Sequence, residues 1–245
     1  MSMSTMNNGE RLDDLMKSGR KIIQCESEFC FSMDSVLLAH FPRFKRKYKV
    51  LDLGTGTGVI PLLIADEVNH IEAIELNPKM AEIARRNVEL NGLADKIKVI
   101  EGDYKNHRQL FKSESFDLVL ANPPYRAIGS GAVNELEGVA TARHEFTATL
   151  EDVVKAARFV LRYHGIFCII HITERLCEIV ETLHRHQFEM KRLRLIQPKF
   201  GRAPNLMLIE AMVGGQPGSL NIMPPLIVHE TDGSYTEEIK NIYGE

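Results

Sequence analysis

Three glycines at alternate positions, Gly54, Gly56 and Gly58, separate an apolar run at 50–53 from a helical pattern that begins at Val59. This order predicts a strand, a tight turn and a helix. Glycine allows positive φ and close approach to a ligand, and a helix start presents free N–H groups. The spacing departs from the Gly-x-Gly-x-x-Gly pattern of dinucleotide sites, which disfavours a pyrophosphate cradle. The turn is a candidate nucleotide-type cofactor site, or else a purely structural strand–helix turn.

A carboxylate follows this turn. Residues 71–75 predict a second strand that ends in Glu75, and Asn77-Pro78 opens the next helix. A carboxylate about 20 residues after a glycine turn can accept hydrogen bonds from a ribose diol. Glu75 could instead cap the next helix. Together, the turn and Glu75 favour cofactor binding.

Four motifs then occur in a familiar order, and the chain resembles the class I S-adenosylmethionine-dependent methyltransferases. They are Leu51–Gly58, Glu75, Gly102-Asp103 and Asn122-Pro123-Pro124-Tyr125. With the pattern Phe29-x-Phe31-Ser32-x-Asp34 ahead of them, the arrangement is similar to the bacterial tRNA (adenine-N6)-methyltransferases that modify the anticodon loop of valine tRNA. The resemblance covers roughly residues 20–213.

The chain alternates strand and helix patterns, which predicts an α/β, doubly wound, mostly parallel sheet. The expected strands are 50–53, 71–75, 97–100, 116–121, 166–171, 188–196 and 206–213, and the expected helices include 78–91, 150–163 and 174–186. The last two strands follow each other without a helix, so we expect an antiparallel edge pair. The resemblance implies the seven-stranded, Rossmann-like sheet of class I methyltransferases.

We expect a single domain over residues 1–245. It comprises an N-terminal cover at 1–48, which could include a hairpin, a catalytic core at 49–213 and a loosely ordered tail at 214–245.

The resemblance implies S-adenosylmethionine as cofactor. The residues expected to bind it are Asp34, Asp52, Gly54, Thr55, Gly56, Gly58, Glu75, Leu76, Asp103, Tyr104 and Asn122. Two of them have local alternatives. Asp34 could cap the helix that it precedes, and Asp103 could be an ordinary turn aspartate.

The segment Asn122–Tyr125 follows an apolar strand pattern and carries the expected chemistry. The Asn122 side chain and the rigid Pro123 carbonyl can both accept hydrogen bonds from the N–H groups of one planar amine, which draws its nitrogen toward sp³ geometry and exposes the lone pair. Tyr125 and Pro124 would contact the substrate, and an aromatic ring stacked on a base is worth roughly 1–3 kcal/mol. The alternative is a proline-stiffened loop without catalytic function.

Basic residues are clustered although the net charge is −3. Five lie within Arg43–Lys49, and six lie between Arg185 and Arg202 against one acid. Either cluster could contact RNA phosphates or be an ordinary solvated surface. We expect Lys199 and Arg202 to bind substrate. Arg143 and His144 belong to a long segment at 126–146 that could gate the substrate or anchor a helix.

Composition limits the other classes. Hydrophobic residues make up 44% and charged residues 26% of the 245, as in ordinary globular proteins. The four cysteines form no short metal-binding spacing, so we expect no metal and a reducing cytoplasm. No apolar run approaches 18 residues, so we expect no membrane span. The pattern does not indicate an oligomeric state.

The substrate class is less constrained than the fold. The leading hypothesis is methyl transfer to the N6 amine of an unpaired adenine in tRNA. An amide NH₂ suits the same motif, so a glutamine methyltransferase of release factors is an alternative. Only 49 residues precede Val50, where that family has a helical domain. An rRNA guanine-N2 enzyme, which commonly has Phe at the place of Tyr125, and a non-catalytic cofactor- or RNA-binding scaffold are further alternatives.

Overall fold

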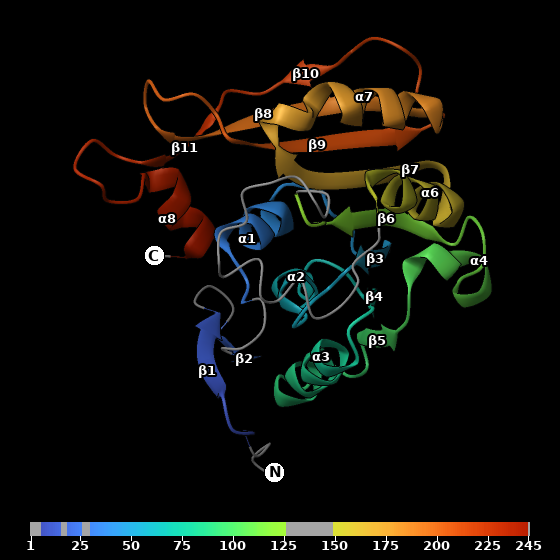
Figure 1. Ribbon diagram of the computed structural model, residues 1–245, viewed down its shortest axis with the longest axis vertical. Coiled ribbons are helices and arrows are strands. Elements are labelled where there is room, and N and C mark those ends of the chain that lie inside the picture. The colour runs from blue at the N-terminus through green and yellow to red at the C-terminus, as the bar shows by residue number, and fades with distance from the viewer. Residues whose placement is uncertain (1–5, 16–18, 26–29, 126–148, 245) are drawn as a thin grey trace.

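In the computed structural model, residues 6–15, 19–25, 30–125 and 149–244 are described. A twisted sheet crosses the molecule, with helices on both faces (Figure 1). All seven predicted strands are present. They are β3 (Lys49–Leu53), β4 (His70–Glu75), β5 (Ile97–Glu101), β6 (Phe116–Ala121), β7 (Leu161–Ile172), β8 (Phe188–Lys199) and β9 (Leu206–Val213).

The sheet order is β10-β8-β9-β7-β6-β3-β4-β5. Only β9 runs antiparallel to its neighbours, β7 and β8, which confirms the predicted antiparallel pairing of the last two core strands. Two short strands that were not predicted, β10 (Asn221–Ile222) and β11 (Leu226–His229), pair with β8 and extend the described sheet to nine strands.

Alternating side chains along the buried strands supply two apolar layers, since successive residues point to opposite faces. On one face lie α1 (Met33–His40), α2 (Val59–Ile64), α3 (Pro78–Leu90) and α8 (Glu237–Tyr243), and on the other lie α4 (His107–Leu110), α6 (Leu150–Val160) and α7 (Leu176–Arg185). In β6, Leu118 and Leu120 pack in the first layer while Val119 and Ala121 pack in the second. The parallel strands are therefore covered by apolar side chains on both faces.

Local signals set the helix limits. Asn77 caps α3, its side chain accepting from the N–H groups of Lys79 and Met80, with Pro78 at the first helical position. Thr149 and Asp152 form a capping box at the start of α6. This helix ends three residues earlier than predicted, and β7 begins at Leu161, because β7 is longer than its apolar run.

The N-terminal cover contains the hairpin of β1 (Glu10–Leu15) and β2 (Arg20–Cys25). The buried Asn87 side chain on α3 joins it to the glycine turn. Its amide accepts from the Ile23 N–H at 2.6 Å and donates to the carbonyls of Ile23 and Thr57 at 3.0 and 2.9 Å. The hairpin is therefore fastened to the same helix that backs the turn.

The predicted loose tail is wrong for the described residues of the C-terminal segment. β10, β11 and α8 follow Gly214, and Leu226, Val228 and Ile239 are buried against the α1 side of the sheet. The apolar run Leu226–Val228 is only three residues long and Ile239 is isolated, so neither formed a recognisable strand or helix pattern. No helix in the described ranges has the length and apolar character needed to cross a membrane.

Candidate cofactor site and catalytic loop

The glycine turn follows β3 and begins α2. Gly54, Gly56 and Gly58 have φ of +75°, +58° and +85°, the left-handed region that other residues rarely adopt. A Cβ at Gly58 would contact Ala84 of α3 at 3.4 Å, whereas a Cβ at Gly54 would meet no atom within 4 Å. The positive φ rather than packing therefore requires glycine at position 58, and Gly54 leaves the backbone open on the side where a Cβ would point.

Glu75, at the end of β4, braces this turn. Its side chain is buried, and its two carboxylate oxygens accept the N–H groups of Gly56 and Asn77, both at 2.8 Å. Burial raises the pKa of Glu75, and these backbone hydrogen bonds act in the opposite direction. Because Asn77 itself caps α3, Glu75 is not the helix cap. Each carboxylate oxygen retains a lone pair for a further donor. Leu76 lies half-buried between these groups.

Asp52 and Thr55 present buried oxygens beside the turn. Among the described residues, neither Asp52 oxygen nor Thr55 Oγ1 has a hydrogen-bond partner. Burial raises the pKa of Asp52 to about 7; the neighbouring Thr55 hydroxyl acts in the opposite direction, and the charge of Glu75 adds to the increase. Orphaned buried acceptors are rare in folded proteins, and their presence beside an open glycine turn fits a ligand that brings its own donors.

We expect Asp52 to make stability fall as pH rises. The folded state holds its proton up to about pH 7, whereas the unfolded chain releases it near the ordinary value of 3.8. Between these values the unfolding free energy of the wild type should drop by up to about 1.4 kcal/mol per pH unit relative to Asp52→Asn. Urea titrations at the two ends of this range measure the difference, and parallel pH dependences of the two proteins would contradict it.

Asp103 and Tyr104 lie at the same edge of the sheet, just past Glu101, whose strand partner is Glu75. Asp103 Oδ1 accepts from the Lys105 N–H at 2.8 Å, so the predicted turn role is present. The carboxylate is not buried and can still accept from a ligand. Tyr104 packs against the α6 side of the core, where burial raises the pKa of its hydroxyl.

The Asn122–Tyr125 loop begins beside the glycine turn, because Ala121 of β6 pairs with Leu53 of β3. The Asn122 amide nitrogen donates to the buried Ser35 hydroxyl at 3.0 Å. The Tyr125 hydroxyl contacts the Asp34 carboxylate and lies 3.2 Å from Asn122 Oδ1. A tyrosine hydroxyl carries one proton, and a carboxylate is the stronger acceptor. Asn122 Oδ1 therefore keeps its capacity to accept from a substrate.

The predicted helix-cap role of Asp34 is wrong. The cap position of α1 is Ser32, and Asp34 contacts Tyr125 instead. Its expected contact with the cofactor stays a prediction. The first turn of α1 thus holds both polar side chains of the loop through Asp34 and Ser35.

Sequence reasoning missed two residues next to this loop, His171 and Arg175. The His171 ring lies 5.1 Å from the Tyr125 ring, and Arg175 donates to the Tyr125 carbonyl at 3.2 Å. Burial, and secondarily the charge of Arg175, lowers the pKa of His171 to about 4, so the ring is neutral at pH 7. A polar residue at the carboxyl end of an otherwise apolar strand was the available signal.

The expected substrate residues are placed differently from one another. Pro123 is half-buried and Pro124 is exposed in the loop. Lys199 and Arg202 are exposed on the hairpin between β8 and β9. Arg143 and His144 lie outside the described residues.

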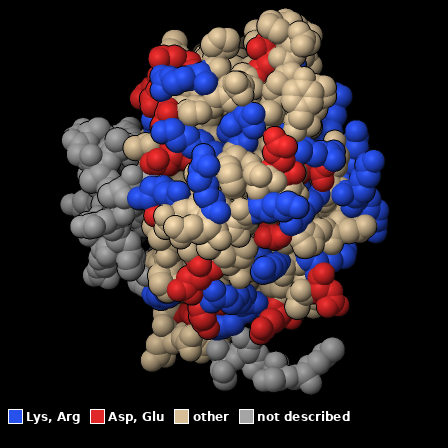
Figure 2. Space-filling view, turned by 90° about the vertical axis from the view of Figure 1, so that its right-hand side faces the viewer, with Lys and Arg blue, Asp and Glu red and all other residues tan. Residues whose placement is uncertain are grey.

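The basic cluster at Arg43–Lys49 is far from this arrangement along the strands. It precedes β3, so it lies where the parallel strands begin, whereas the site lies where they end. Lys49 pairs there with Glu72 at 2.8 Å. Basic and acidic side chains are intermixed on the side of the molecule that lies to the right in Figure 1 (Figure 2). Contact between the Arg43–Lys49 cluster and RNA phosphates stays a prediction. It would involve a surface away from the catalytic loop.

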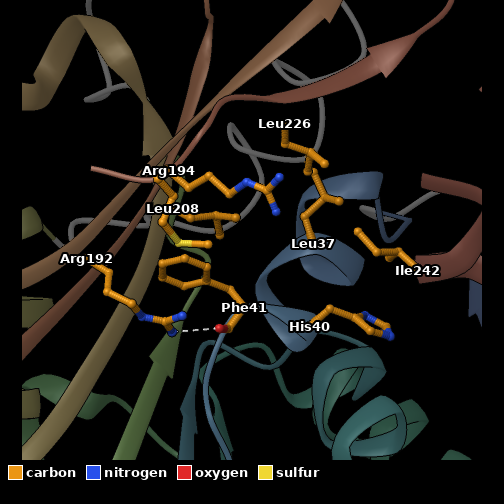
Figure 3. A pocket seen from close by; sticks show the side chains of 9 residues that line it. Leu37, His40, Phe41, Arg192, Arg194, Leu208, Leu226 and Ile242 are labelled. Atoms are coloured by element: carbon orange, nitrogen blue, oxygen red, sulfur yellow. Dashed lines mark hydrogen bonds between the residues drawn. The ribbon is translucent and has the colours of Figure 1, made fainter. Parts of the chain in front are cut away.

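A cavity of about 160 Å³ lies elsewhere, between α1, the sheet and the C-terminal segment (Figure 3). Leu37, Phe41, Arg192 and Leu208 are among its lining residues. It includes no residue of the glycine turn or of the catalytic loop, and is therefore not the candidate cofactor site. Among the described residues no cluster of three or more His, Cys, Asp or Glu side chains could hold a metal.

The sheet order, the single antiparallel strand β9 and the glycine turn after β3 define the class I methyltransferase fold. Residues 32–191 match the family model described as methyltransferase small domain, and the chain belongs to this family. It is therefore an S-adenosylmethionine-dependent methyltransferase.

Two bacterial tRNA methyltransferases are among the proteins similar to this chain in sequence. The chain is 28% identical over 213 residues to the tRNA1(Val) (adenine(37)-N6)-methyltransferase of Photorhabdus laumondii, covering 85% of this chain and 84% of the relative. It is 28% identical over 217 residues to the protein of the same name from Bacteroides thetaiotaomicron, covering 86% and 87%.

Solved structures support the fold. A predicted O-methyltransferase from Agrobacterium tumefaciens superimposes with a TM-score of 0.70 at 25% identity, over 86% of this chain and 96% of that one. Trm5 from Methanocaldococcus jannaschii, solved in complex with adenosine, gives 0.62 at 14% identity, over 87% and 59%.

Proposed function

We propose that this methyltransferase acts on the N6 amine of an unpaired adenine in tRNA, in the anticodon loop. The observation that carries the proposal is the Asn122 amide, whose nitrogen is held by Ser35 and whose oxygen keeps its acceptor capacity beside the glycine turn. The tRNA adenine-N6-methyltransferases among the relatives support the substrate class.

S-adenosylmethionine supplies an electrophilic methyl group on a sulfonium sulfur. The chain's own groups would hold it as follows. The Gly54–Gly58 turn would give backbone access, and Glu75, which braces the turn through the Gly56 N–H, would accept from the ribose hydroxyls. The buried acceptors of Asp52 and Thr55 suit the donors of a ligand in the turn. Four other residues near the carboxyl ends of the parallel strands would complete the site: Leu76, Asp103, Tyr104 and Asp34.

Methylation of an aromatic amine needs its lone pair freed from the ring. Asn122 Oδ1 and the Pro123 carbonyl would accept hydrogen bonds from the two N–H groups and draw the nitrogen toward sp³ geometry. The ring of Tyr125, held by Asp34 and by the carbonyl contact of Arg175, would stack on the base with Pro124 alongside. Preorganised acceptors of this kind act mainly in the transition state.

The acceptor base is expected to be unpaired. A paired adenine has its N6 amine engaged and stacked, and extruding it costs a few kcal/mol. Single-stranded loops avoid this penalty, which favours an anticodon-loop target.

A partition assay separates the alternatives. Labelled methyl transfer is measured in parallel to bulk tRNA, to ribosomal RNA and to a release factor. The proposal expects label in tRNA. Label in release-factor glutamine or in ribosomal guanine would replace it with one of the other methyltransferases, and no transfer to any of them would favour the scaffold.

Ser35 provides a test of the amide's orientation. Ser35→Ala removes the acceptor that fixes the Asn122 nitrogen, so the amide can rotate away. We expect kcat to fall by about 10- to 10²-fold, the effect of small misplacement, with little change in KM. Ser35→Thr keeps the hydroxyl and should restore the rate. Equal activities of Ser35→Ala and wild type in steady-state kinetics would show that Ser35 does not position the amide.

A further inference from the structure

Phe200 stands out on the surface at the turn between β8 and β9. Its exposed fraction is 81%, above those of Ile222 at 65% and Tyr163 at 62%, and no large apolar side chain in the described ranges is more exposed. The exposed cations Lys199 and Arg202 flank it. No ion pair joins Lys199 or Arg202 to another described residue. Isolated exposed apolar residues are common, so its position must carry the argument.

The β8–β9 hairpin projects beyond the carboxyl ends of the parallel strands, the end of the sheet that also carries the catalytic loop (Figure 1). Ile172, the last residue of β7, and Ile196 of β8 both pair with Leu206. Phe200 is four residues beyond Ile196, which at 3.3 Å per residue places it up to about 13 Å past the end of β7. In the sheet order β8 is three strands from β6, about 14 Å across at roughly 4.8 Å per strand, so Phe200 is offset from the loop and is placed for a group next to the substrate rather than for the substrate itself.

Hydrogen bonds connect the hairpin to the segment that follows β7 and contacts the loop. The Thr173 N–H donates to the Asn205 carbonyl at 3.1 Å, and the Thr173 hydroxyl donates to the Pro204 carbonyl at 2.9 Å. Two residues further on, Arg175 donates to the Tyr125 carbonyl. Phe200 and Tyr125 are thus two aromatic rings linked through one short segment, residues 173–175.

We propose that Phe200 is a stacking platform for a nucleobase that neighbours the acceptor base in single-stranded RNA, with Lys199 and Arg202 at the adjoining phosphates. This inference rests on the proposed function for the identity of the acceptor. An aromatic ring between two cations is the chemistry of single-strand binding, in which bases stack and the backbone is neutralised. A protein partner would be expected to use a contiguous apolar patch, and Phe200 is flanked by charge instead.

The test uses the full chain and two readouts. The first is fluorescence anisotropy with a labelled single-stranded RNA oligonucleotide, alone or annealed to its complement. The second is the KM for tRNA. Phe200→Ala should weaken single-strand binding and raise this KM by about 5- to 100-fold, while Phe200→Tyr should behave as wild type. Tyr163→Ala is the matched control, since Tyr163 is an exposed aromatic residue near the start of β7, at the opposite end of the strands.

The outcomes separate this inference from the proposed function. Weaker single-strand binding by Phe200→Ala, with Tyr163→Ala unchanged, supports the platform even if the wild type methylates no tRNA, and in that case only the proposed function fails. If the wild type methylates tRNA and Phe200→Ala alters neither readout, the platform is overturned. It is also overturned if Phe200→Ala changes only self-association in light scattering, or weakens single-strand and duplex binding equally.

Discussion

Replacing Asn122 with alanine should reduce turnover on tRNA by about 10²- to 10³-fold, as the loss of one preorganised polar contact in a transition state does. Asn122 Oδ1 is the side-chain acceptor of the loop, and the Asn122 amide nitrogen donates to the Ser35 hydroxyl on α1. The interaction strengthens as the amine nitrogen becomes sp³, so the effect should appear in kcat more than in KM. Steady-state kinetics with saturating cofactor measures it.

The control for Asn122→Ala is cofactor affinity, measured by calorimetric titration. The glycine turn is held by Glu75 and by the Ile74 carbonyl, neither of which contacts Asn122. Affinity should therefore change much less than turnover. Full activity of Asn122→Ala on tRNA would remove Asn122 from catalysis, and an equal loss of affinity and turnover would indicate a damaged cofactor site.

Replacing Glu210 with alanine should lower the free energy of unfolding by about 3–5 kcal/mol, because it leaves a buried charge without its partner. Arg192 of β8 and Glu210 of β9 pair across the strands at 2.5 Å, and both side chains are nearly buried. Arg192 also donates to the Phe41 carbonyl at 2.8 Å and lies over the Phe41 ring (Figure 3). Urea denaturation of wild type and variant measures the loss.

The neighbouring pair is the matched control for Glu210→Ala. Arg194, also on β8, pairs with the half-exposed Glu238 at 2.7 Å. Glu238→Ala should cost about 1 kcal/mol or less, because exposed pairs contribute little. The double variant Arg192→Met with Glu210→Leu should recover most of the stability, since it removes both charges together. Equal losses from Glu210→Ala and Glu238→Ala would show that burial does not determine the effect.

Much of the fold follows from local sequence signals. Strand patterns such as Phe116–Ala121 and the Asn77-Pro78 helix start depend on neighbouring residues alone, and the structure confirms them. The C-terminal segment was predicted poorly because β10 and β11 are two and four residues long and depend on pairing with β8. Their stability comes from tertiary contacts that no local pattern contains.

The candidate site also has parts that the sequence predicts and parts that it does not. The glycine turn and Asn122–Tyr125 carry their own local signatures. Their supports do not, since Ser35 is 87 residues from Asn122 and Asp34 is 91 residues from Tyr125. Asp34 was assigned to the cofactor or to a helix cap because only its own helix was visible in the sequence. A contact of this separation becomes apparent only once the sheet places α1 beside the end of β6.

Nucleoside analysis of treated tRNA identifies the base that receives the methyl group. tRNA lacking modification is incubated with the purified protein and S-adenosylmethionine, digested to nucleosides and examined by mass spectrometry, with Asn122→Ala as the matched control. We expect N6-methyladenosine with the wild type and a strongly reduced amount with the variant, and we expect nuclease fragments to assign the methyl group to an unpaired adenine of the anticodon loop. Methylation confined to another nucleoside, to a paired adenine or to protein would contradict this expectation.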